Sequence, residues 1–207
     1  MAAGSTIGPA AFRVAGNRVT IEARRQPQTA RRTLAAVQVD EDEDVSAMAR
    51  GFAVAGYYES GAWHCVPLPP SVLEELTVLL SALRSQPPEN GPFVIAAVAD
   101  EFFVMARQAG AHTNLMLSDL TASVEFRLAA QVLTRLGEDP PSEDELDDIW
   151  PLGDLDLLED LGLSEDDMEA ILDDLDAFPD EMLEEIAARI GITDTFAAAS
   201  ALARVAP

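Results

Sequence analysis

Apolar and polar residues alternate along residues 52–66 in the manner of two short β-strands joined by a turn at Gly61. After an intervening helical segment, β-rich runs occur again at three places, which are residues 93–99, 102–107 and 112–117. Only a few residues separate consecutive runs, and connections this short join antiparallel neighbours. The pattern therefore predicts an initial hairpin followed by a three-stranded meander.

The spacing of apolar residues changes to a helical period in two segments of the same region. The first helix is predicted to begin at the capping pair Ser71 and Glu74, and its leucines recur three and four residues apart until Pro87. The second helix is predicted over residues 121–136, with Gly137 as its C-cap. The element order is then ββαβββα, for which we expect an α+β fold with an antiparallel five-stranded sheet and two helices packed on it.

Residues 154–205 show short helical stripes of Leu, Ile and Met, interrupted by helix-breaking residues. A short helix is predicted over residues 155–161, and the next begins at the capping pair Ser164 and Asp167. Pro179 separates that helix from a third, and apolar residues near the C-terminus indicate a fourth. We expect these helices to form a small all-helical module.

Composition divides the chain into four segments. Residues 1–50 are rich in Arg and then acidic, and we expect this extension to be disordered or to lie upstream of a true start near Met48. Residues 137–153 are typical of a linker, because they are acidic and contain consecutive prolines. The boundaries are residues 1–50 for the N-terminal extension, 51–136 for the α+β domain, 137–153 for the linker and 154–205 for the acidic helical module.

Charge is concentrated at the C-terminal end of the chain. Residues 137–207 contain 23 Asp and Glu against two Arg, which gives −21 of the total −24. Such a surface attracts a cationic protein and repels nucleic acid phosphates. We therefore expect a basic protein partner and no direct binding of nucleic acid. The chain also lacks an apolar run of about 18–20 residues and the apolar core of a signal peptide, so we expect a cytoplasmic protein without a membrane partner.

Residues that carry catalytic or metal chemistry are few. Cys65 is the one cysteine, and neither His64 nor His112 has partners at ligand spacing. An EF-hand register that begins at Asp154 fails, because Leu158 and Glu159 stand where the third acid and the glycine belong. The sequence predicts no catalytic residue, no metal ligand and no cofactor.

The segment between the second and third C-terminal helices is the candidate partner-binding surface. An apolar Phe-Pro turn is surrounded there by acids. The alternative interpretation is a plain connector between helices, with Phe178 in the core. The residues expected to bind a partner are Asp173, Asp174, Asp176, Phe178, Asp180 and Glu181.

Several blocks of residues carry a family resemblance. They are Phe52-Ala-Val-Ala, Asp100-Glu-Phe-Phe-Val, Leu117-Ser-Asp, Gly153-Asp-Leu-Asp, Asp160-Leu-Gly-Leu and Asp173-Asp-Leu-Asp-Ala-Phe-Pro-Asp-Glu-Met-Leu. In these blocks the chain resembles the actinobacterial tRNA adenosine deaminase-associated protein family, over roughly residues 50–195. The resemblance implies a gene neighbour of the tRNA adenosine deaminase and makes that enzyme a candidate partner. It transfers no catalytic residues.

The chain is not itself a zinc deaminase, because that chemistry requires H-x-E and P-C-x-x-C segments and this chain has a single cysteine. Three functional interpretations remain. We expect a non-catalytic accessory protein that binds a basic protein surface. The alternatives are an enzyme or metal-binding protein with an acidic site, and an RNA-binding protein that uses a basic arm with Arg24, Arg25, Arg31 and Arg32.

Overall fold

The computed structural model describes residues 51–142, 146 and 149–205, and all of these belong to one compact unit. The predicted N-terminal extension, with its Arg-rich arm and Met48, lies outside the described residues. Part of the predicted linker lies outside them too. None of the helices in the described part of the chain has the length and apolarity that crossing a bilayer requires.

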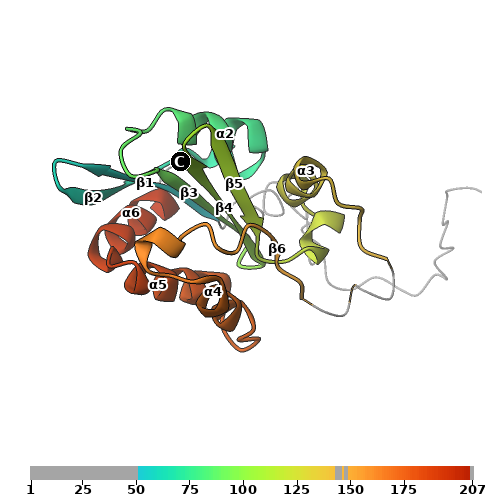
Figure 1. Ribbon diagram of the computed structural model, residues 1–207. Coiled ribbons are helices and arrows are strands. Elements are labelled where there is room, and N and C mark those ends of the chain that lie inside the picture. The colour runs from blue at the N-terminus through green and yellow to red at the C-terminus, as the bar shows by residue number, and fades with distance from the viewer. Residues whose placement is uncertain (1–50, 143–145, 147–148, 206–207) are drawn as a thin grey trace, which may run out of the picture. The chain divides into compact units, whose positions relative to one another are not determined.

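Six antiparallel strands form one sheet in the order β2-β1-β3-β4-β5-β6 (Figure 1). The predicted α+β class, the first hairpin and the meander are confirmed, and the number of strands is six where five were predicted. The bounds are Phe52–Glu59 for β1, Ala62–Pro67 for β2, Phe93–Val98 for β3, Phe102–Ala109 for β4, His112–Leu117 for β5 and Leu152–Gly153 for β6.

Five α-helices accompany the sheet in the described part of the chain, together with three short 3-10 helices. The 3-10 helices are η1 at Pro70–Leu73, η2 at Thr121–Val124 and η4 at Glu159–Leu161. The α-helices are α2 at Leu76–Arg84, α3 at Arg127–Leu136, α4 at Glu165–Leu172, α5 at Pro179–Arg189 and α6 at Thr193–Val205.

Each face of the sheet carries its own apolar core, because successive strand residues point to opposite sides. One core joins the strand residues Ala55, Val94 and Val104 to side chains of α2 and α3. The other joins Phe52, Phe103 and their neighbours on that face to the acidic C-terminal helices. In Figure 1 these helices, coloured orange to red, lie on the side of the sheet opposite α2.

The acidic helices are thus the second cover of the sheet. Phe196 of α6 meets Phe52 of β1 edge to face, with 6.0 Å between the ring centroids. All six residues of β3 are buried, as expected for a central strand that is covered on both faces. An amphipathic helix can be strongly acidic and still bury one apolar stripe, since its charged residues occupy the outward side.

Three local predictions are wrong, and each has a physical reason. The first helix has no Ser71–Glu74 capping box, because Ser71 lies in η1 and α2 begins only at Leu76, after the extended Glu75. Gln131 of α3 accepts the N–H of Leu76 at 2.7 Å. The second predicted helix divides into η2 and α3 at Phe126, whose extended backbone brings its ring to Phe102. The third difference concerns residues 155–161, where the short 3-10 helix η4 replaces the predicted α-helix because Arg107 donates to the Leu157 carbonyl.

Candidate functional site

The connection between α4 and α5 is held by its own acids. The Asp174 carboxylate accepts the N–H of Asp176 at 3.2 Å, and this bond supports the turn. Pro179 occupies the first turn of α5, and the Glu181 carboxylate accepts the N–H of Phe178 at 2.9 Å. The backbone of this predicted partner-binding segment is therefore fixed without any contribution from the Phe178 ring.

Leu175 and Phe178 are the two most exposed large apolar side chains in the described part of the chain. Their exposed fractions are 73% and 62%. The interpretation that placed Phe178 in the core is wrong, because the core between α4 and α5 is filled by Met168, Ile171 and Leu183. Both side chains belong to the connection between α4 and α5.

A groove of about 330 Å³ lies beside this connection. Its apolar lining comes from Ala170, Ile171, Ala177 and Met182, and its acidic lining from Asp174, Asp176, Glu181 and Glu185. Three of the six predicted partner-binding residues, Asp174, Asp176 and Glu181, are thus brought together. Hereafter the groove and the side chains of Leu175 and Phe178 are called the α4–α5 surface.

The other predicted residues have different positions. Asp173 is the C-cap of α4 and does not line the groove. Asp180 lies 3.2 Å from the Arg204 guanidinium of α6, and that guanidinium also stacks over the Phe52 ring at 4.4 Å. Asp180 therefore joins two helices to the sheet and is less available to a partner.

A few of the C-terminal acids are neutralised within the fold. Arg189 forms ion pairs with Asp167 at 3.1 Å and with Glu185 at 3.0 Å. Ser164 caps α4, and its hydroxyl lies 2.7 Å from the Asp167 carboxylate. That hydrogen bond, and then Arg189, lower the pKa of Asp167. Residues 154–205 contain 16 Asp and Glu and two Arg. Most carboxylates in this range therefore have no cationic partner among the described residues.

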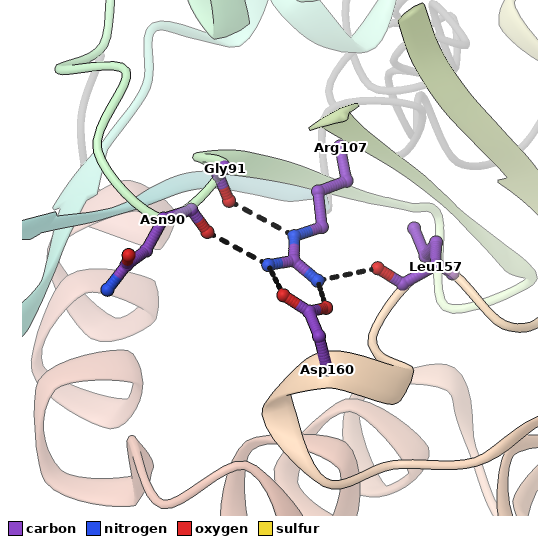
Figure 2. A network of polar contacts seen from close by, with 5 residues as sticks. All are labelled: Asn90, Gly91, Arg107, Leu157 and Asp160. Carbon is purple, nitrogen blue, oxygen red and sulfur yellow. Dashed lines mark hydrogen bonds and ion pairs between the residues drawn. The ribbon is translucent and has the colours of Figure 1, made fainter. Parts of the chain in front are cut away.

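Arg107 is a second polar centre, and the sequence patterns did not single it out (Figure 2). Its side chain is 6% exposed, and it lies on β4. Nε donates to the Gly91 carbonyl at 3.1 Å, and the two terminal nitrogens donate to the carbonyls of Asn90 at 2.9 Å and Leu157 at 2.8 Å. Both terminal nitrogens also pair with the Asp160 carboxylate. All five N–H donors of the guanidinium are thereby used.

The Arg107 network joins the sheet to the acidic C-terminal segment. Asp160 belongs to η4, and its side chain is 68% exposed although it is paired with Arg107. A hollow of about 320 Å³ opens beside them. Because the guanidinium has no donor left, it is an anchor of the fold and offers no anion-binding group. The alternation along β4 could have indicated that Arg107 points into the core, since Arg107 lies on the same sheet face as the buried Phe103 and Met105.

Gly153 and Asp154 anchor the same segment to the edge of the sheet. The Asp154 carboxylate accepts the N–H of Leu115 at 2.9 Å, and the backbone N–H of Asp154 donates to the Leu115 carbonyl at 2.9 Å. Gly153 has φ +102°, and a Cβ there would lie 2.1 Å from the Leu115 carbonyl oxygen. The Gly-Asp-Leu-Asp and Asp-Leu-Gly-Leu blocks therefore each contain an acid that holds the C-terminal segment on the sheet.

His64 and Cys65 each have a partner within the fold. His64 stacks on Tyr57 with 5.4 Å between centroids, and its Nε2 lies 3.2 Å from the Glu59 carbonyl oxygen. Burial raises the pKa of the Cys65 thiol, and the hydrogen bond donated by Thr195 opposes that effect. No group of three or more His, Cys, Asp or Glu in the described ranges is placed to hold a metal ion.

The six-stranded sheet and the helices on its two faces define an α+β protein. The sequence profile of the Rv3753c-like tRNA adenosine deaminase-associated proteins matches residues 51–193. The protein Rv3753c of Mycobacterium tuberculosis is 41% identical over 150 residues, which cover 72% of this chain and 86% of that protein. The chain therefore belongs to the Rv3753c-like tRNA adenosine deaminase-associated family. No solved structure matches it.

Proposed function

We propose that this protein is a non-catalytic accessory protein that binds a basic protein surface through its α4–α5 surface. The observation that carries the proposal is the exposure of Leu175 and Phe178 beside an acid-lined groove. Apolar side chains at the centre of an interface supply most of the affinity. The surrounding carboxylates would steer a cationic partner and reject an anionic one.

The tRNA adenosine deaminase is the first partner to test, because the family is named for its association with that enzyme. An enzyme that binds tRNA must present cationic groups to the phosphate backbone. A protein with a net charge of −24 complements such a surface and is itself repelled by tRNA. Binding would take place in the cytoplasm and would regulate or position the enzyme without contributing a catalytic group.

The test is an isothermal titration calorimetry experiment, in which the purified full chain is titrated with the deaminase of the same organism at low and at high salt. We expect binding that weakens with salt, because the charges of both partners are exposed. The L175S/F178S variant should bind about tenfold or more weakly, since each truncated apolar anchor costs about 1 kcal/mol or more.

The matched control for this titration is V124S. Val124 is 58% exposed and lies in η2, away from the α4–α5 surface. It should bind like the unmodified chain. The proposal of this partner fails if the deaminase does not bind even at low salt. The proposal of this surface fails if the two variants bind equally well.

A further inference from the structure

The groove of the α4–α5 surface has a composition that suits one kind of side chain. Ile171 is 5% exposed and forms an apolar floor together with the half-buried Met182. Acids from two elements stand around this floor, with Asp174 and Asp176 from the connection and Glu181 and Glu185 from α5. An aliphatic stem that ends in a cation would match both parts.

The acids of the groove keep free acceptor atoms. Asp174, Glu181 and Glu185 each use one carboxylate oxygen, for the N–H of Asp176, the N–H of Phe178 and the Arg189 guanidinium respectively. The Asp176 carboxylate has no partner among the described residues. Several acceptors therefore remain around the floor, and together they can receive a ligand with many donors in one plane.

We infer that the groove receives an arginine side chain from a basic segment of the partner, and this inference rests on the proposed function. The guanidinium has five donors in a planar fork and is more weakly hydrated than the lysine ammonium, so it suits a half-apolar groove with several carboxylates. Its stem lies on Met182 and Ile171. A neighbouring apolar residue of the same segment then contacts Leu175 or Phe178, which stand exposed beside the groove.

The experiment follows the methyl signal of Met182 by NMR in the full chain. The probes are the peptide acetyl-Ala-Leu-Arg-Ala-amide and its lysine counterpart. We expect the arginine peptide to shift the Met182 methyl signal at a concentration several-fold lower than the lysine peptide requires. In the D176N/E181Q variant the shift should be lost or weakened about tenfold or more, because both changes remove a negative charge and keep the size of the side chain.

The matched control is E169Q/E184Q, which removes the same charge from exposed positions of α4 and α5 outside the groove. It should respond like the unmodified chain. Equal weakening in both variants, or a Met182 signal that the arginine peptide leaves unmoved, would overturn the inference.

Titration with the deaminase separates this inference from the proposed function. If the deaminase binds tightly and D176N/E181Q binds it equally well, the arginine site is wrong and the accessory role stands. If the deaminase does not bind and the arginine peptide still shifts Met182 selectively, the arginine site stands and the partner is a different basic protein.

Discussion

Arg107 shows how one charged residue can be part of a sheet core. Its guanidinium meets three backbone carbonyls and one carboxylate, and these come from the loop before β3 and from the acidic segment. A buried charge is tolerated only when such partners replace water. The exposed acid of the pair, Asp160, has water as an alternative partner, and Arg107 has none.

The two partners of this pair should therefore contribute unequally to stability. We expect R107L to lower the free energy of unfolding by about 3 kcal/mol, because it leaves the buried Leu157 carbonyl and the partly buried carbonyls of Asn90 and Gly91 without their donor. D160N should cost less, about 1 kcal/mol, since the amide oxygen can still accept an N–H of Arg107 and the three backbone carbonyls remain in place. Urea unfolding measures both values.

R127L is the control for this pair of variants, because Arg127 is 71% exposed in its ion pair with Glu75. Its cost should be about 0.5 kcal/mol or less. Equal costs for R107L and R127L would contradict the assignment of Arg107 as an anchor.

Asp167 provides a titration at the start of α4. Its pKa is lowered by the Ser164 hydroxyl and then by Arg189. A group with a lowered folded-state pKa stabilises the fold at pH values above its unfolded pKa, and this contribution is lost as the pH falls through the folded pKa. We expect S164A to raise the pKa of Asp167 toward the ordinary value of an aspartate, as measured by carboxyl NMR. An unchanged pKa would show that Arg189 alone sets it.

At the scale of elements, the strands were predictable because alternate residues face opposite sides of the sheet and each side has its own apolar core. β5, at His112–Leu117, has the predicted bounds. β6 was not predictable, since two residues carry no period. Residues 155–161 contain the leucines of a helix, yet hydrogen bonds from Arg107 to Leu157 and between Asp154 and Leu115 hold the backbone in another path. Tertiary contacts overrode local propensity there.

The candidate surface was predictable only in part. The acids and the Phe-Pro turn marked the position of the connection, but the exposure of Phe178 depends on how α4 and α5 fill the space between them. The spacing of Leu175 from Ile171 and Leu172 would place its side chain on the same apolar stripe if the helix continued. It lies outside α4, which ends at Leu172, and this is why it is exposed.

Two glycines with similar backbone angles should respond differently to alanine. Gly153 has φ +102° and Gly162 has φ +98°, but only at Gly153 would the new Cβ meet a backbone oxygen, at 2.1 Å. We expect G162A to cost about 1 kcal/mol from the left-handed backbone alone. G153A should cost about 3 kcal/mol, because β6 must also move away from β5. Thermal unfolding compares the two, and equal costs would contradict the close contact between the strands.

At the scale of the whole molecule, the acidic helices and the sheet depend on each other. Seven large side chains on one sheet face are buried in the core shared with these helices, and they are Phe52, Val54, Phe93, Ile95, Phe103, Met105 and Met116. Each contributes about 1.5–3 kcal/mol when buried. Their sum is comparable with the roughly 5–15 kcal/mol of a typical net stability.

A chain truncated after Gly137 should therefore lose its cooperative unfolding transition in urea. The truncated sheet would expose that whole apolar face, so we also expect it to aggregate. The full chain is the reference. A truncated chain that unfolds cooperatively at the same urea concentration would show that residues 51–136 form an independent domain.

We propose that the partner binds at the α4–α5 surface. The most direct measurement places the photo-crosslinking residue p-benzoylphenylalanine at position 178 in cells and identifies the captured protein by mass spectrometry. Position 124, which is also exposed, serves as the control. We expect a crosslink from position 178 to the tRNA adenosine deaminase and none from position 124. A crosslink to the deaminase from position 124 alone, or from neither position while the two proteins copurify, would contradict the proposal.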